Sequence, residues 1–227
     1  MIRTIVFDID GTLYDYDSAD LAASGAVADY AVQNLGMTDA EFRSALKEAS
    51  GQLTAAVGKT AASHNRLIRY AFILESASLP LTHAIRMEEL YWDTLLEHAV
   101  VFEGTKEALE HLKQQGYKLG IGSNMTAYIQ YRKLEKFGLL GLFDFIVTSE
   151  ETGCEKPDPA LFLRCAELAG CSPAECMYVG DSLKNDAEGA ASAGMTAVLF
   201  DAKRTYKRTN DGIIIINCMT ELYDLVN

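Results

Sequence analysis

Carboxylates, hydroxyl groups and a lysine recur in this sequence just after short apolar runs. The first pair, Asp8 and Asp10, follows a run that ends at Phe7. The others, each after its own run, are Ser123, Asn124, Lys156, Asp181 and Asp186. If the runs are parallel strands, these residues meet at the carboxyl edge of one sheet, where ligands bind. Such a set suits a hard divalent cation, and Mg²⁺ usually takes one or two carboxylates together with phosphate oxygens. The pattern therefore predicts a magnesium site for a phosphorylated substrate.

An alternation of strands and helices is expected to position these residues. Short apolar, β-rich runs predict strands at residues 2–7, 117–121, 143–148, 176–179, 195–200 and 212–216. Helical patterns lie between or after them at residues 105–115, 126–137, 159–169, 185–193 and 220–226, and the first four stop at a glycine. The predicted fold class is therefore α/β, a Rossmann-like doubly wound parallel sheet with helices on both faces.

The connection over residues 13–116 is far longer than one crossover helix needs, so it predicts an insertion. Its sequence shows helical patterns at residues 18–34, 39–50, 60–77 and 82–98. The second of these begins with a capping-box pattern of Thr38 and Glu41. We expect a helical-bundle cap domain at residues 16–100 and a catalytic core at residues 1–15 and 101–227.

The motifs resemble those of the haloacid dehalogenase-like hydrolase superfamily, specifically the phosphatases with a helical cap inserted after the first motif. Four stretches carry the resemblance: Asp8-Ile9-Asp10-Gly11-Thr12-Leu13, Ser123-Asn124, Lys156-Pro157-Asp158-Pro159, and Gly180-Asp181-Ser182 with Asp186. They come in the order of the family and span most of the chain. A lone D-x-D pair would be weak evidence, whereas four ordered motifs are strong evidence.

The resemblance implies roles for these residues. Asp8 is the expected nucleophile, which forms an aspartyl-phosphate. Asp10 is expected to protonate the leaving oxygen and then to activate the hydrolytic water. Magnesium is expected between the carboxylates of Asp8 and Asp181 and the backbone carbonyl of Asp10. Asp186 is expected to orient Lys156 or a metal-bound water.

The same resemblance predicts which groups bind the substrate phosphate. The Ser123 hydroxyl and Lys156 are expected to hold the transferring oxygens, and backbone amides near Gly11 and Asn124 are expected to help. Thr12, which follows Gly11, belongs to this predicted phosphate-binding set.

Charge and composition narrow the partners and the compartment. With 20 Lys and Arg against 32 Asp and Glu, the net charge is −12, which disfavours nucleic acid and anionic membranes as partners. Five cysteines without C-x-x-C spacing favour neither a disulfide framework nor a zinc site, and we expect them to be small core residues. No signal peptide or membrane span is recognisable, so we expect a cytoplasmic protein, as a monomer or weak homodimer.

The roles of two other polar residues of the insert, Asp20 and His64, are not decided by the sequence pattern. Asp20 is expected to be a solvated residue near the start of the cap. His64 lies near Lys59, Arg66 and Arg69, where a substrate-facing basic group would be useful, although a packing or surface role is the default for a lone histidine.

The function predicted from these observations is magnesium-dependent hydrolysis of a small phosphorylated metabolite. Two alternatives stay open: phosphoglucomutase-like phosphoryl transfer, which would keep every core residue, and a catalytically silent phosphate-binding module. The presence of Asp10 argues against dehalogenation, because the dehalogenase relatives lack an aspartate there. Phosphonate cleavage needs a cap lysine that forms a Schiff base, and nothing marks Lys47 or Lys59 for that role.

Overall fold

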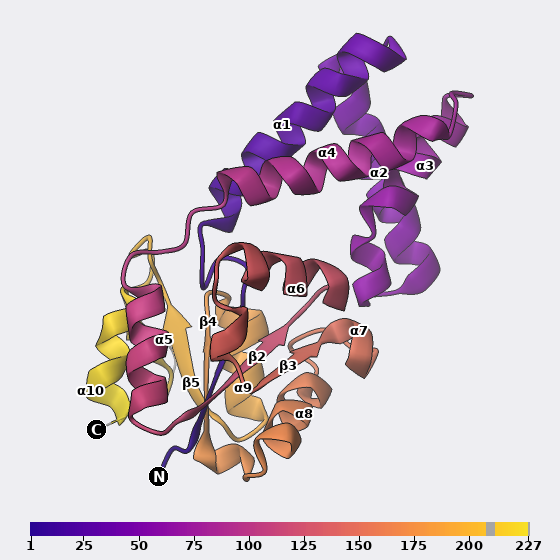
Figure 1. Cartoon of the computed structure of the whole chain (residues 1–227). Helices are drawn as coiled ribbons and strands as arrows, with labels where there is room; N and C mark the ends of the chain where they lie inside the picture. The colour runs from indigo at the N-terminus through magenta and orange to yellow at the C-terminus, as the bar shows by residue number, and fades with distance from the viewer. Residues whose placement is uncertain (208–211, 227) are drawn as a thin grey trace. The chain divides into compact units, whose positions relative to one another are not determined.

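The computed structural model describes residues 1–207 and 212–226, and these divide into two compact units, residues 1–15 with 101–227 and residues 16–100. In the first unit, six parallel strands form one sheet in the order β3-β2-β1-β4-β5-β6 (Figure 1). The strands are β1 (Thr4–Phe7), β2 (Lys118–Ser123), β3 (Phe145–Thr148), β4 (Cys176–Gly180), β5 (Thr196–Phe200) and β6 (Ile214–Ile216). The predicted α/β class is thereby confirmed.

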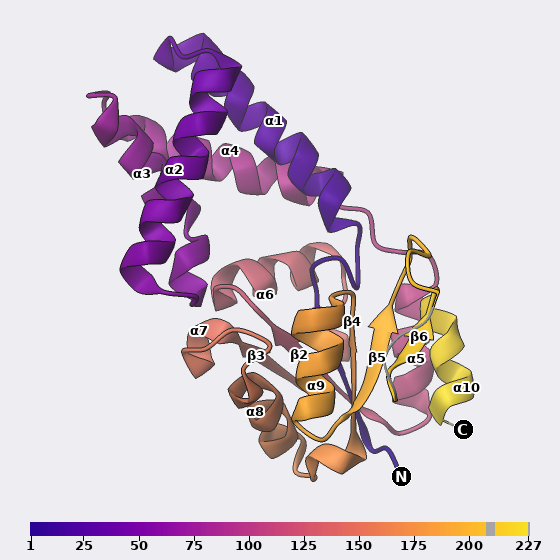
Figure 2. The ribbon, with the colours of Figure 1, turned by 180° about the vertical axis from the view of Figure 1, so that it is seen from behind.

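Helices cover both faces of this sheet. Helix α6 lies in front of it in Figure 1, and α9 lies in front of it when the molecule is seen from behind in Figure 2. The helices of this unit are α5 (Thr105–Gln114), α6 (Ala127–Lys136), α7 (Ser149–Thr152), α8 (Pro159–Ala169), α9 (Glu188–Ser192) and α10 (Leu222–Val226). Single turns lie at η2 (Leu140–Leu142), η3 (Pro173–Glu175), η4 (Leu183–Ala187) and η5 (Met219–Glu221).

The central strands β1 and β4 are fully buried. The polar motifs begin where these strands end. All four residues of β1 are buried, and Phe7 is in register with Ile121 of β2 and Val179 of β4. The residues that follow Phe7 and Val179 therefore leave the sheet at the same edge. This register brings the motifs of three neighbouring strands together.

One predicted helix differs from the structure in its first turn. The pattern at residues 185–193 predicts a regular helix, but the chain forms the wide π-helical turn η4 before α9. The amides of Asp186 and Ala187 both donate to the Ser182 carbonyl, and the buried Asp186 carboxylate accepts the Ser182 amide at 2.9 Å. The wide turn therefore accompanies an inward-pointing carboxylate.

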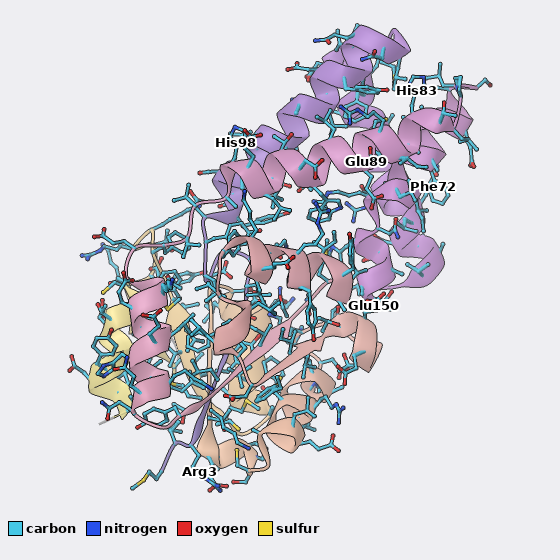
Figure 3. The ribbon with its side chains drawn as sticks, viewed as in Figure 1. Arg3, Phe72, His83, Glu89, His98 and Glu150 are labelled. Carbon is cyan, nitrogen blue, oxygen red and sulfur yellow. The ribbon has the colours of Figure 1, made fainter. Side chains whose placement is uncertain are left out.

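The second unit consists of four long helices and one short turn: α1 (Tyr16–Leu35), α2 (Asp39–Val57), η1 (Ala61–His64), α3 (Arg66–Ser76) and α4 (Thr82–His98). Thr38 and Glu41 form the capping box that starts α2. The pattern at residues 60–77 predicts one helix, but the chain breaks at Asn65, whose side chain accepts the Ile68 amide and caps α3. Helix α1 packs along α4, which carries the labelled His83 in Figure 3. The Tyr30 hydroxyl of α1 lies 2.8 Å from His83 Nδ1.

The five cysteines differ in how far they are buried. Of the five cysteines, Cys165 and Cys176 are buried, Cys154 and Cys171 are partly exposed, and Cys218 is exposed, so the prediction of a core position is wrong for Cys218. None of the helices in the described residues is long and apolar enough to cross a membrane.

Candidate active site

A cavity of about 190 Å³ lies at the carboxyl edge of the central strands, within the first unit. Asp8 follows β1, Ser123 ends β2, and Asp181 follows β4. The lining consists of Asp8, Asp10, Ser123, Asn124, Lys156, Asp181, Ser182, Asn185 and Asp186. The structure thus brings together in the lining all of the predicted site residues except Gly11 and Thr12, which adjoin Asp181. The motifs did not single out Ser182 and Asn185 as separate site residues.

The Asp8 carboxylate is held through one of its two oxygens. Asp8 is 7% exposed, and its Oδ1 accepts the Ser123 hydroxyl at 2.6 Å and lies 2.8 Å from Lys156 Nζ. Gln130 Nε2 in turn donates to the Ser123 hydroxyl at 2.8 Å, which fixes its orientation. None of the residues that the structure describes donates a hydrogen bond to Asp8 Oδ2. This arrangement fixes the carboxylate and leaves one oxygen for chemistry.

Lys156 is a buried cation shared by two carboxylates. Its Nζ lies 2.8 Å from Asp8 Oδ1 and 2.6 Å from Asp186 Oδ1, and it donates to the Tyr178 hydroxyl at 3.0 Å. Burial acts to lower the pKa of Lys156, but Asp186 and Asp8 raise it well above its usual value. Asn124 Oδ1 accepts the Lys156 amide at 2.9 Å and so holds the loop. Lys156 is therefore charged and fixed in place.

Three carboxylates are close enough to share a cation. One oxygen each of Asp8, Asp181 and Asp186 lie within 4.8 Å of one another. Burial, together with neighbouring carboxylates and against the pull of Lys156, raises the pKa of Asp8 to about 6 and that of Asp181 to about 7. An all-oxygen donor set of this charge fits Mg²⁺. Because Asp186 already pairs with Lys156 and accepts the Ser182 amide, Asp8 and Asp181 are the better ligands.

Gly11 and Thr12 act on Asp181 in this structure. Gly11 has φ +78°, and a Cβ there would lie 2.5 Å from Asp181 Oδ2, so glycine leaves room for this carboxylate. The Thr12 hydroxyl is buried and donates to Asp181 Oδ1 at 3.2 Å. The side chain of Thr12 therefore positions Asp181, and the placing of Thr12 in the phosphate-binding set stays a prediction.

A network that the motifs did not reveal surrounds the Asp10 carboxylate. Lys133 Nζ donates to its two oxygens at 2.6 and 2.8 Å, the Tyr14 hydroxyl donates at 2.5 Å, and Gln130 Nε2 donates at 3.4 Å. Burial acts to raise the pKa of Asp10, but the charge and hydrogen bonds of Lys133, with those of Tyr14 and Gln130, lower it. Asp10 is therefore held in its ionised form.

A sequence signal for Lys133 does exist. Lys133 is 1% exposed and lies on the buried face of α6 with Ile129, Gln130 and Leu134. A lysine at an apolar position of an amphipathic helix is rarely buried without a partner. That pattern points to a buried ion pair but does not say which carboxylate Lys133 meets.

We expect Lys133→Met to reduce kcat for p-nitrophenyl phosphate about 10- to 100-fold, because Asp10 would lose the group that holds its orientation. Lys136→Met, on the exposed side of the same helix, is the matched control and should keep the wild-type kcat. Steady-state kinetics with circular dichroism of both variants tests this. A folded Lys133→Met variant with wild-type kcat would show that the ion pair does not serve catalysis.

Comparison with known sequences places the chain among enzymes of one family. A sequence model of haloacid dehalogenase-like hydrolases matches residues 2–194. A ribulose-1,5-bisphosphate 5-phosphatase of Halopiger xanaduensis is 36% identical over 208 residues, which cover 88% of this chain and 85% of that protein. A glyceraldehyde 3-phosphate phosphatase of Methanothermobacter thermautotrophicus is 33% identical over 207 residues, covering 90% and 88% of the two chains.

Solved structures of the same superfamily share the fold over the whole chain. A HAD phosphatase from Thermococcus onnurineus aligns with a TM-score of 0.76 at 30% identity and covers 100% of this chain and 98% of its own. A 2-haloacid dehalogenase from Pseudomonas syringae pv. Tomato aligns with a TM-score of 0.82 at 26% identity, with the same coverage. The chain therefore belongs to the haloacid dehalogenase-like hydrolases, as its four motifs predict, and it is an enzyme of that family.

Proposed function

We propose that this enzyme is a magnesium-dependent phosphatase that hydrolyses a small phosphorylated sugar through an aspartyl-phosphate on Asp8. The observation that carries this proposal is the buried Asp8 carboxylate, whose Oδ1 is fixed by Ser123 and Lys156 while Oδ2 receives no donor from the described residues. The phosphatase names of the relatives described above support the same reaction class.

In the first step, Asp8 attacks the phosphorus atom and the bond to the sugar oxygen breaks. Lys156 and the Ser123 hydroxyl bind the transferring oxygens. Asp10 gives the departing sugar oxygen a proton that it has taken up beforehand, from the water that attacked in the preceding turnover or from solvent, and so returns to its ionised form. A Mg²⁺ ion held by Asp8, Asp181 and the Asp10 carbonyl would neutralise the phosphate charge. Lys156 adds a second positive charge beside the Asp8 carboxylate. The two positive charges reduce the repulsion between this carboxylate and the substrate phosphate.

In the second step, water attacks the phosphorus atom of the aspartyl-phosphate and Asp8 is released. Asp10 takes the proton of this water, and inorganic phosphate leaves. The donors around Asp10, chiefly Lys133, favour the ionised carboxylate, which is the form that accepts a proton. The same network orients Asp10 in both steps.

Sugar phosphates are the substrate class that the relatives favour, since their names specify ribulose 1,5-bisphosphate and glyceraldehyde 3-phosphate. The net charge of −12 repels long polyanions, whereas a bound cation with Lys156 reverses the field at one point. Residues 16–100 would act as the cap over such a substrate, and the cytoplasm is the compartment we propose.

A silent binding module is disfavoured because Asp8, Asp10, Lys156 and Asp181 are all retained and line one cavity. Dehalogenation is disfavoured despite the similarity to a haloacid dehalogenase, because Asp10 is present and held by three donors.

Metal removal tests the proposal. Hydrolysis of p-nitrophenyl phosphate should fall at least about 100-fold in EDTA and return with added Mg²⁺, because several kcal/mol of charge stabilisation depend on the ion. Added KCl of equal ionic strength is the control and should not restore the rate. An unchanged rate in EDTA would refute the metal requirement. A rate screen over phosphorylated sugars then identifies the substrate.

A further inference from the structure

The second unit contains a partly open cavity, lined by both polar and apolar side chains, that the proposed reaction does not use. Its volume is about 270 Å³, and all four long helices of the unit contribute to its lining. Tyr16, Asp20 and Ser24 of α1 are spaced four residues apart, so they share one face of that helix. Arg66 and Arg69 of α3 line the same cavity. Both arginines are partly exposed, and a charge in such a position still needs solvent or a partner, because desolvating an unmatched charge is costly.

Arg66 is fixed by aromatic rings and by one carboxylate. Its guanidinium lies 3.7 Å from the Tyr91 ring centroid and 4.6 Å from that of Trp92. It also donates to the Tyr91 hydroxyl, to the Tyr16 hydroxyl at 3.5 Å and to Asp20 Oδ1 at 3.4 Å. Asp20 is therefore an ion-pair partner in the cavity wall, and its side chain is also 35% exposed to solvent. The charge of Arg66 is matched, and its position is set.

Arg69 differs because its hydrogen bonds go to a neutral group. Its Nε donates to the Ser63 carbonyl at 3.2 Å, and a terminal nitrogen donates to the same oxygen. None of the residues that the structure describes gives Arg69 a carboxylate partner. Burial and the nearby charge of Arg66 lower the pKa of Arg69, against the smaller opposing effect of Tyr70, Tyr16 and Tyr91.

The charges that line the cavity are two guanidinium groups and one carboxylate, Asp20, so the cavity carries a positive surplus in a chain of net charge −12. The hydroxyl group of Ser24 is also in the lining and can donate a hydrogen bond, whereas the Ser50 and Tyr16 hydroxyls already donate to the Leu46 carbonyl and to Asp20 Oδ1. A planar guanidinium matches the geometry of carboxylate and phosphate oxygens.

We propose that this cavity is a binding site for a compact oxyanion, a carboxylate or phosphate group, with Arg69 as its principal ligand. A free anionic metabolite would supply this group. Binding does not depend on the proposed phosphatase activity.

Sulfate binding tests the site without catalysis. Trp92 is the single tryptophan of the chain and lies against Arg66, so its fluorescence reports on the cavity. The full chain is titrated with sulfate in EDTA at constant ionic strength. The wild type should give a saturable change, Arg69→Gln should bind at least about tenfold more weakly, and Arg69→Lys should bind more tightly than Arg69→Gln.

The matched control is Arg43→Gln, which removes an exposed arginine paired with Asp39 in the same unit and should bind sulfate as the wild type does. Circular dichroism establishes that each variant is folded. No saturable response in the wild type, or equal sulfate affinity in a folded Arg69→Gln variant, would overturn the proposal.

Kinetics then shows whether the occupied site acts on the enzyme. Sulfate should alter kcat of the wild type and of Arg43→Gln at saturating p-nitrophenyl phosphate, and it should do so less in Arg69→Gln. Absence of any Mg²⁺-dependent hydrolysis would refute the proposed function and leave the sulfate titration to decide on the site.

Discussion

Asp8→Asn should lower the hydrolysis of p-nitrophenyl phosphate by about 10⁴-fold or more while leaving the protein folded. An amide nitrogen cannot replace the attacking carboxylate oxygen, so no phosphorylated enzyme should form. The amide oxygen of the variant can still accept from Ser123 and Lys156, as Asp8 Oδ1 does at 2.6 and 2.8 Å. Because burial and neighbouring carboxylates raise the pKa of Asp8 to about 6, removal of this charge should not destabilise the metal-free protein.

Three measurements check this prediction. Steady-state kinetics gives the rate, thermal unfolding gives the stability, and mass spectrometry after acid quenching shows whether one phosphoryl group is attached to the wild type and absent from the variant. Asp144→Asn is the control, because Asp144 precedes β3 at the opposite edge of the sheet and pairs with the exposed Lys113. Retention of more than about one hundredth of the wild-type rate by Asp8→Asn would mean that another group attacks the phosphate.

The position of the candidate site could be predicted because it depends on topology. Asp8 and Asp181 each follow a short apolar run, and parallel strands in register bring such residues to one edge. The sequence pattern contains both the strand ends and the residue types, and the relation needs no knowledge of side-chain packing. The predicted pairing of Asp186 with Lys156 rests on the family resemblance, and the two groups lie 2.6 Å apart in the structure.

The partners of Asp10 could not be predicted in this way. Lys133 lies on α6 and reaches Asp10 across 123 residues of sequence, so no local pattern connects them. Tyr178 is similar, because a tyrosine inside a buried strand is normally core, yet its hydroxyl accepts from Lys156. Such contacts depend on how helices and strands pack, which periodicity alone does not encode.

The sequence pattern does not predict helix boundaries at which a side chain, instead of the helix itself, accepts a backbone amide. Asn65 interrupts the predicted helix at residues 60–77 because its side chain accepts the Ile68 amide. Asp186 has a comparable effect at residues 185–193, where its carboxylate accepts the Ser182 amide in the wide turn. In both places the apolar pattern of the helix continues along the sequence, but a side chain accepts a backbone amide at the predicted start or middle of the helix.

Lys156→Met should lower the free energy of unfolding by about 3–5 kcal/mol in the absence of metal, because it leaves the buried Asp8 and Asp186 carboxylates without their cation. It should also reduce kcat about 10²- to 10³-fold, because a fixed positive charge beside the transferring oxygens is lost. Urea unfolding and steady-state kinetics measure the two effects. Lys113→Met, which breaks the exposed pair with Asp144, should cost no more than about 1 kcal/mol.

The double variant Lys156→Met/Asp186→Asn separates the structural from the catalytic role of this lysine. Removing the Asp186 charge, one of the two carboxylates left without a cation, should raise the free energy of unfolding by about 1–3 kcal/mol relative to Lys156→Met alone. The two effects should couple because Lys156 and Asp186 contact each other directly. The activity should stay low, because Asp186→Asn restores no positive charge at Asp8. Equal stability of the single and double variants would show that the Lys156–Asp186 pair contributes little to folding. Recovery of activity without Lys156 would refute its role beside the phosphate, because the double variant has no other side chain that supplies the positive charge of Lys156 next to Asp8.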